Sequence, residues 1–169
     1  YHEAGHALTA KKVSNLNRVT KVSIIPSTKG TGGFSMNIPP DKMYQSKKDI
    51  VNNIIIALGG RAAEEVIFGK ENITTGASSD LKKATEMTLS MIGAFGMDDE
   101  LGLINYEVLL GQNIGNNKYL LERAKSILDK LYEETKEIII ENMKSLDSIA
   151  NKLLEQEVLG EEEIDLLVS

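Results

Sequence analysis

The sequence contains no cysteine and no tryptophan, has only three prolines, and is just 5% aromatic. Without cysteine there can be neither a disulfide framework nor a thiolate metal site. The scarcity of aromatic residues favours a mainly helical domain over a β-sandwich. The most apolar run, Ile54-Ile55-Ile56-Ala57-Leu58, falls far short of the roughly 20 residues that a membrane-spanning helix needs. These absences leave a helical domain as the simplest expectation.

The charge balance also limits the function. The 169 residues carry 25 acidic against 19 basic side chains, a formal net charge of −6. An acidic chain of this kind argues against a nucleic-acid partner. The length fits a single domain, and a hydrophobic content of 41% is enough for a core.

Residue patterns predict a mainly α fold with one small β-hairpin and a C-terminal helical bundle. Apolar residues at helical spacing, with capping signals such as Ser46-Lys47-Lys48-Asp49, predict helices over 1–12, 47–68, 79–94, 117–142, 145–156 and after Gly160. Residues 19–25 and 33–38 are predicted strands, joined by the turn-rich loop 26–32. Residues 97–116 are expected to be irregular.

The second strand of the hairpin has two interpretations. Its period-two pattern and the prolines that follow predict an accessible edge, where an extended polypeptide could add through main-chain hydrogen bonds. The expected contact residues are then Gly33, Phe34, Ser35, Met36 and Asn37. Alternatively, the apolar residues of this strand, Phe34, Met36 and Ile38, simply pack onto the helices, and both interpretations can hold together.

Both histidines of the chain lie in one five-residue motif, His2-Glu3-Ala4-Gly5-His6. Because a helical residue turns by about 100°, His2 and His6 lie about 40° apart on neighbouring turns, close enough to bind one tetrahedral zinc ion. Glu3 lies beside them, where a carboxylate can act as general base toward a water molecule that zinc acidifies. The alternative is that these are ordinary polar residues at the start of a helix.

A catalytic zinc site needs a third protein ligand. No histidine remains, and Lys12 stands where an extended His-Glu-x-x-His-x-x-Gly-x-x-His motif would place one. The ligand must therefore be a carboxylate, and the candidates are Glu64, Glu65 and Asp80. Asp80 also has a simple structural interpretation as an acid in the first turn of a helix.

Several ordered motifs resemble one family of proteins. The stretches HEAGHA at 2–7, LGGRAAEEVIFG at 58–69, TTGASSDLKKAT at 74–85, VSIIP at 22–26 and GGFSMNIP at 32–39 resemble the FtsH-type, membrane-anchored, ATP-dependent zinc metalloprotease family. The resemblance implies that His2, His6 and Asp80 bind Zn2+ and that Glu3 is the catalytic carboxylate. Glu64 and Glu65 then have supporting or ion-pairing roles, with Arg61 as their local partner.

The resemblance also implies a domain organisation. Residues 1–169 are expected to be the peptidase domain alone, with a catalytic core over 1–100 and a helical part over 101–169. An AAA ATPase module and transmembrane segments are expected upstream, and the substrate is expected to be unfolded polypeptide. The implied assembly is a homo-hexamer in the bacterial inner membrane or an organelle membrane, with this domain on the cytoplasmic side.

Two other functions compete with an endopeptidase. A silent helical scaffold could keep the metal only for stability and ring assembly, but it would have no need of the base Glu3. A metal-dependent hydrolase of small molecules would have no need of an exposed strand.

Overall fold

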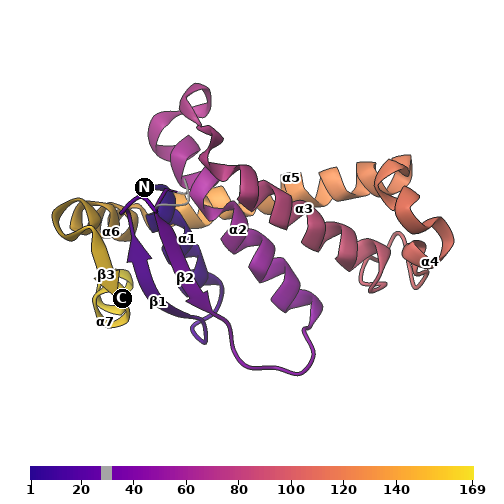
Figure 1. The fold of residues 1–169 in the computed structure, drawn as a ribbon, viewed down its shortest axis with the longest axis horizontal. Helices are drawn as coiled ribbons and strands as arrows, with labels where there is room; N and C mark the ends of the chain where they lie inside the picture. Colours follow the sequence, from indigo (N-terminus) through magenta and orange to yellow (C-terminus); the bar gives the residue numbers. More distant parts are fainter. Residues whose placement is uncertain (28–31) are drawn as a thin grey trace.

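We describe a computed structural model of the chain that covers residues 1–27 and 32–169. The chain folds into helices packed beside a small sheet (Figure 1). The helices are α1 His2–Val13, α2 Lys47–Phe68, α3 Ser78–Gly93, α4 Tyr106–Leu110, α5 Lys118–Glu141, α6 Met143–Gln156 and α7 Glu161–Val168. The strands are β1 Arg18–Ser23, β2 Phe34–Ile38 and β3 Val158–Gly160, and short 3-10 helices cover Lys70–Asn72, Thr75–Ala77 and Gly111–Asn116. The expected mainly α class is confirmed.

Local signals in the sequence account for the ends of α2. The Ser46 hydroxyl accepts from the Asp49 backbone N–H, and the Asp49 carboxylate accepts from the Ser46 N–H, which confirms the capping box. At the other end Gly69 has a φ of 86°, a conformation that favours glycine. The expected turn at 26–32 lies partly outside the described residues, since 28–31 are not described.

The sheet has three antiparallel strands in the order β2-β1-β3. This order makes β2 an edge strand, as the sequence predicts. The third strand was not predicted, because three residues are too few to show a period-two pattern; it pairs Leu159 with Val22 of β1. The segment expected to be irregular contains α4 and a 3-10 helix, and Asn105 caps α4 by accepting backbone hydrogen bonds.

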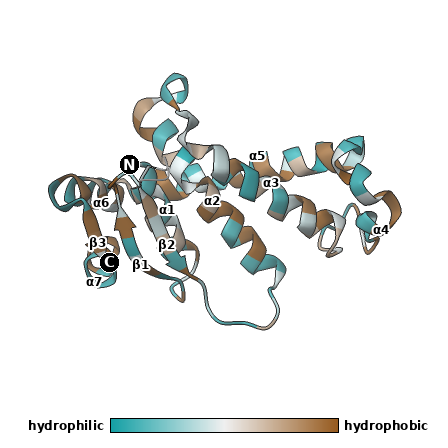
Figure 2. Cartoon of the chain, in the orientation of Figure 1, coloured by the Kyte–Doolittle hydropathy of each residue, from teal (hydrophilic) through white to brown (hydrophobic). Residues whose placement is uncertain are grey.

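Two clusters of buried side chains hold the elements together. One joins α1, β1, α6 and α7, with Leu8 and Ile149 among its fully buried members. The other joins α2, α3 and α5, with Ile54 and Leu120. Apolar and polar residues alternate along helix α5 (Figure 2). Its buried residues Leu120, Ala124 and Leu131 belong to the second cluster. No helix within the described residues has the length and apolarity that a bilayer span requires.

Helices α1 and α2 cross at a pair of glycines. A methyl group on Gly5 would lie 2.3 Å from the Gly59 carbonyl oxygen, and one on Gly59 would lie 2.7 Å from the Gly5 carbonyl oxygen. Contacts this short leave no room for a Cβ on either helix. The close crossing presses the motif-bearing face of α1 against α2, and it explains why a glycine stands at position 59 inside a helix.

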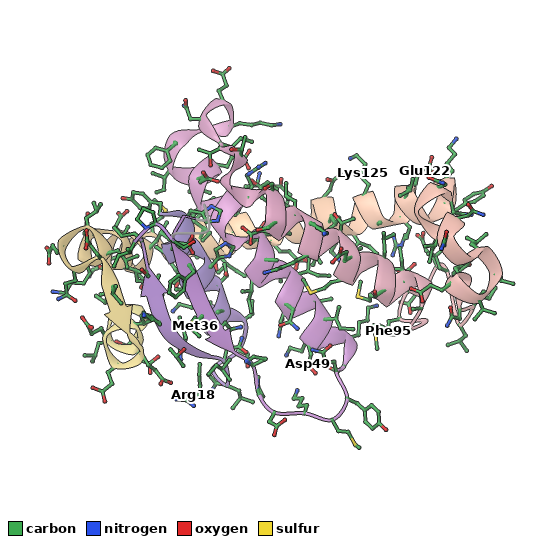
Figure 3. The ribbon with its side chains drawn as sticks, in the orientation of Figure 1. Arg18, Met36, Asp49, Phe95, Glu122 and Lys125 are labelled. Carbon is green, nitrogen blue, oxygen red and sulfur yellow. The ribbon has the colours of Figure 1, made fainter. Side chains whose placement is uncertain are left out.

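The apolar face of β2 points away from the helices, contrary to the packing interpretation. Phe34, Met36 and Ile38 are 38%, 50% and 46% exposed, while Ser35 and Asn37 point inward. Met36 lies on the open side of the sheet (Figure 3). The sequence identifies two faces of this strand, but its apolar residues do not pack on the core.

Candidate metal centre

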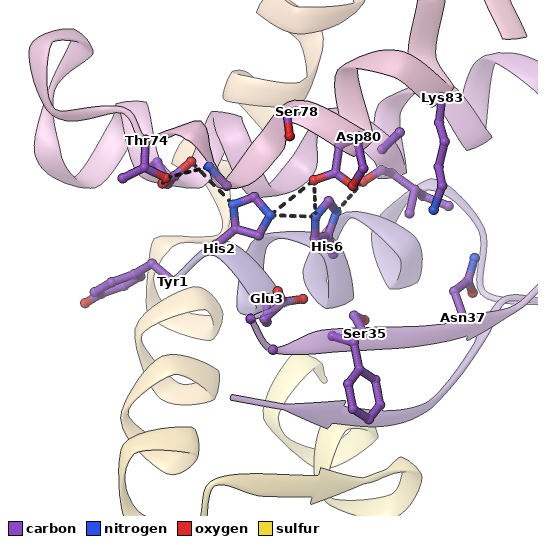
Figure 4. A pocket seen from close by; sticks show the side chains of 18 of the residues that line it. Tyr1, His2, Glu3, His6, Ser35, Asn37, Thr74, Ser78, Asp80 and Lys83 are labelled. Atoms are coloured by element: carbon purple, nitrogen blue, oxygen red, sulfur yellow. Dashed lines mark hydrogen bonds and ion pairs between the residues drawn. The ribbon is translucent and has the colours of Figure 1, made fainter. Parts of the chain in front are cut away.

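Three side chains from two helices converge on one point. His2 and His6 come from α1, and Asp80 comes from the first turn of α3. The two Nε2 atoms lie 3.1 Å apart, and Asp80 Oδ2 lies 3.2 Å from each of them (Figure 4). Among the described residues, these three are the group whose geometry could hold a metal ion. The structure thus brings together two neighbouring turns of one helix and a carboxylate more than 70 residues away.

Partners on the far side of each ring fix the imidazole tautomers. His6 Nδ1 lies 2.7 Å from the Ile56 carbonyl oxygen, which can only accept, so Nδ1 donates and Nε2 keeps a lone pair. His2 Nδ1 lies 3.3 Å from Glu64 Oε2, a carboxylate that favours the same tautomer. Both Nε2 lone pairs are therefore available on the side that faces Asp80.

The arrangement fits a zinc ion. Two lone pairs and a carboxylate oxygen face one another at hydrogen-bond distance, and in these tautomers no proton lies between them. Such a set is repulsive until a cation or a proton occupies it. Ligands of a tetrahedral zinc ion with bonds of 2.0–2.1 Å lie about 3.3 Å from each other, close to the 3.1 and 3.2 Å observed. A set of two imidazoles and one carboxylate matches the donors of a catalytic zinc site.

The electrostatics of the centre favour a positive charge. Burial alone would lower the pKa of His2, but the Asp80 and Glu64 carboxylates within hydrogen-bond distance of its ring and the charge of Glu3 raise the pKa above its ordinary value. Burial raises the pKa of Asp80, but the His2 and His6 imidazoles at hydrogen-bond distance outweigh it and hold this pKa well below its usual range. The carboxylate is therefore ionised and the site attracts cations.

Glu3 lies beside the imidazole pair, on the side of β2 (Figure 4). Burial raises the pKa of Glu3, although the charges of the two histidines oppose the shift. The raised pKa makes the carboxylate a stronger base. A Cβ on Gly33, the residue before β2, would lie 2.2 Å from the Ser23 carbonyl oxygen and 3.1 Å from Glu3 Cγ, so glycine lets the chain pass close to both β1 and Glu3. Glu3 accepts no hydrogen bond from the described residues and is free to accept a proton.

Glu64 and Glu65 have different environments. Glu64 Oε2 contacts His2, and its other oxygen accepts a hydrogen bond from the Thr74 hydroxyl at 2.5 Å. Glu65 lies on the other side of α2, where Lys136 approaches it to 3.5 Å. The prediction that Arg61 pairs with one of these glutamates is wrong. The Arg61 guanidinium donates to the Thr74 carbonyl oxygen instead. Neither glutamate carboxylate belongs to the three converging groups.

Gly60 lies directly against the imidazole tips. A Cβ at this position would lie 2.5 Å from His2 Nε2 and 2.7 Å from His6 Nε2. Only glycine lets α2 run this close to the converging nitrogens. The two glycines of α2 thus have separate roles, one at the helix crossing and one beneath the candidate metal centre.

A cleft of about 1000 Å³ opens beside the centre and is lined by α1, α2, α3 and β2. Of the residues predicted to contact substrate, Gly33, Phe34, Ser35 and Asn37 line it, but Met36 does not. The Ser35 hydroxyl and the Asn37 amide oxygen are buried and have no hydrogen-bond partner within residues 1–27 and 32–169.

Sequence reasoning missed the residues that hold the ligands from behind. The Ile56 carbonyl is a backbone group and leaves no signature in the sequence. The Thr74 hydroxyl reaches Glu64 across a loop, which only the fold reveals. Gly60 left a signal, since a glycine inside an apolar helix costs about 1 kcal/mol relative to alanine and needs a reason.

A helix that bears a His-Glu-x-x-His motif, with a distant carboxylate turned toward its histidines, defines the class of HExxH metallopeptidases. Within that class the chain belongs to peptidase family M41, whose family model matches residues 1–167. The expected family is thereby confirmed.

Curated relatives agree with this membership. The chain is 50% identical over its whole length to ATP-dependent zinc metalloprotease FtsH 1 of Alkaliphilus metalliredigens, covering 29% of that protein. It is 48% identical over 98% of its length to ATP-dependent zinc metalloprotease FtsH of Lachnoclostridium phytofermentans, covering 28%. It is 34% identical over its whole length to ATP-dependent zinc metalloprotease FtsH 3 of Synechocystis, covering 30%. The chain thus spans less than a third of the length of these relatives.

Proposed function

We propose that residues 1–169 form the peptidase domain of an ATP-dependent zinc metalloprotease that hydrolyses peptide bonds of unfolded proteins. The observation that carries this proposal is the convergence of His2 Nε2, His6 Nε2 and Asp80 Oδ2 at 3.1–3.2 Å, with Glu3 beside them. Zinc held by these atoms would supply a Lewis acid that acidifies water and polarises a carbonyl group.

The roles of the protein groups follow from their positions. Glu3 accepts a proton from the attacking water and returns it to the leaving amine. Glu64 and the Ile56 carbonyl orient the imidazoles, so that each Nε2 stays unprotonated. Residues 1–100 contain all of these groups, and the helices of residues 101–169 support them.

The edge strand β2 is the proposed binding site for the substrate backbone. An extended chain that adds to this edge forms main-chain hydrogen bonds, which do not depend on its sequence. Gly33, Phe34, Ser35 and Asn37 line the cleft beside Glu3, which supports this placement, and Met36 would contribute only its backbone. Recognition of this kind suits a protease of unfolded proteins.

The whole protein would supply the rest of the reaction. The names of the relatives describe ATP-dependent enzymes, which supports an AAA ATPase module ahead of this domain. From the family resemblance we further propose a homo-hexamer anchored in a bacterial inner membrane or an organelle membrane, with this domain on its cytoplasmic side. Together these parts would deliver unfolded substrate to the cleft.

Two variants of the full-length protein test the proposal. Glu3→Gln should keep zinc, measured by elemental analysis, and lose ATP-dependent degradation of casein, because the base is gone. Asp80→Ala should lose both zinc and degradation. Normal casein degradation by Glu3→Gln would falsify the assignment of the base, and normal zinc content in Asp80→Ala would remove Asp80 from the metal site.

A further inference from the structure

The charges that line the cleft are uneven. Glu3, Glu64 and Asp80 all line it, and apart from the two histidines of the metal centre Lys83 is the one basic side chain among its described lining residues. Lys83 lies one turn beyond Asp80 on α3, and its side chain points from α3 into the cleft to one side of His6 (Figure 4). Within the described residues it forms no ion pair. An ammonium group in a cleft that is otherwise acidic determines which charged ligands that end of the cleft accepts.

Asn37 lines the same cleft as Lys83 and comes from a different element, β2. Figure 4 shows the nitrogen of Asn37 directed from β2 toward the gap into which the Lys83 nitrogen points. The amide oxygen of Asn37 is the buried end of the group, and it has no hydrogen-bond partner in the described part of the chain. The two walls therefore present N–H donors to the same space. A group that accepts hydrogen bonds and carries negative charge matches both donors.

The cleft lining also includes apolar surface. Ile56, Ala57 and Met87 line the cleft together with the polar Asn53. An aliphatic stem packs against such a surface while its charged head reaches the donors. Among side chains of proteins, glutamate has this combination of a methylene stem and a carboxylate, and aspartate has a shorter stem.

We propose that Lys83 and Asn37 form a subsite that selects an acidic side chain, glutamate before aspartate, close to the bond that is cut. This inference rests on the proposed function. Without Lys83 the carboxylates of the cleft would repel an acidic residue, so the lysine reverses the preference. The rest of the substrate binds through main-chain hydrogen bonds to β2, which do not depend on its sequence. This subsite adds a preference for substrates with an acidic residue at one position.

Peptides that differ at one residue test the subsite. The probes are unstructured fluorogenic peptides, capped at both ends, with Glu, Gln or Lys at each position around the cleavage site, and a second set has the same sequences without caps. The full-length protein should cleave the best-placed Glu peptide about five-fold faster in kcat/KM than its Lys counterpart, the effect of one partly exposed ion pair. Lys83→Glu should invert this ratio. Lys82→Glu is the matched control, because Lys82 does not line the cleft, and it should keep the wild-type ratio.

The outcomes separate the subsite from the proposed function. Equal cleavage of all peptides by the wild type, or an unchanged ratio in Lys83→Glu, overturns the subsite while peptidase activity stands. If no peptide is cleaved, the proposed function fails. Binding of the same peptides to the Glu3→Gln protein, measured by fluorescence anisotropy, then tests the subsite independently of cleavage. There the Glu peptide should bind about five-fold tighter than the Lys peptide, and adding Lys83→Glu should invert this preference; equal binding of the two peptides before that change overturns the subsite. A preference only for uncapped peptides would assign the carboxylate to the chain end and overturn selection of a side chain.

Discussion

Gly60→Ala is the sharpest test of the metal centre that the structure offers. The added methyl carbon would lie 2.5 Å from His2 Nε2 and 2.7 Å from His6 Nε2. Ordinary contacts begin at about 3.4 Å, so the imidazole tips must withdraw by roughly 0.7–0.9 Å. Zinc–ligand distances tolerate only about 0.2 Å. We therefore expect zinc affinity to fall by about 100-fold, the upper end of the effect of lost ligand support.

The fold should survive the same substitution. The atoms that the methyl group meets are the ends of side chains, which can rotate away, and alanine improves an interior helix position by about 1 kcal/mol relative to glycine. The metal-free variant should therefore unfold in urea at or above the wild-type midpoint. This separates loss of metal from loss of structure.

The assay is competition for zinc against a chelating dye, beside urea unfolding of the metal-free proteins. Gly93→Ala is the control, because its methyl group would meet only the Ile114 side chain, away from the centre, and it should keep the wild-type zinc affinity. If Gly60→Ala also binds zinc as tightly as the wild type, the two imidazoles do not hold the metal in the arrangement described.

Three further changes probe the surroundings. Gly59→Ala places a methyl group 2.7 Å from a backbone oxygen of α1, which cannot rotate away, so it should destabilise the protein in urea by about 1–3 kcal/mol. Thr74→Val removes the hydroxyl that donates to Glu64, the carboxylate that orients His2. Titration should show zinc affinity about 10-fold weaker, while the melting temperature of the metal-free protein stays unchanged. Arg123→Met leaves the buried Asp98 carboxylate unpaired, at a cost of about 2–4 kcal/mol near pH 7 by urea unfolding. Because Arg123 holds the pKa of Asp98 below its ordinary 3.8, the pair stabilises the fold above that pH, and the difference between wild type and variant should shrink as pH falls below it.

The sequence predicts what depends on neighbours along the chain. The spacing of His2 and His6 fixes their proximity as soon as their segment is helical, and the capping box at Ser46 marks where α2 begins. Asp80 is different: from residue patterns alone it is one of three candidate acids. Only the packing of α3 on α2 places its carboxylate 3.2 Å from both imidazoles of α1.

Contacts across the fold escape sequence reasoning for a physical reason. The Thr74 hydroxyl supports Glu64 because a loop returns over α2, and the β3 strand forms because Leu159 meets β1. Neither contact is accompanied by a local periodic pattern in the sequence from which it could be predicted. The hairpin gives the clearest case, since alternation along residues 34–38 identifies two faces and leaves open which one meets the interior.

Because the polar face of β2 points inward, a prediction follows for Ser35. Its hydroxyl is buried in the cleft wall without a hydrogen-bond partner among the described residues, a situation that costs about 1 kcal/mol or more. Ser35→Val removes the unpaired hydroxyl and suits a strand better, so we expect the free energy of unfolding in urea to rise by about 1 kcal/mol.

Casein degradation by the same variant in the full-length protein should fall, because the polar wall beside Glu3 is then replaced by a larger apolar side chain. Gain of stability with loss of function is the signature of a residue kept for binding. Thr20, a partly buried β1 residue whose hydroxyl contacts the Met36 carbonyl oxygen at 3.5 Å, provides the control: Thr20→Val should leave degradation unchanged. A Ser35→Val protein that is less stable, or that degrades casein at the wild-type rate, would show that the inward face of β2 serves the fold and not the substrate.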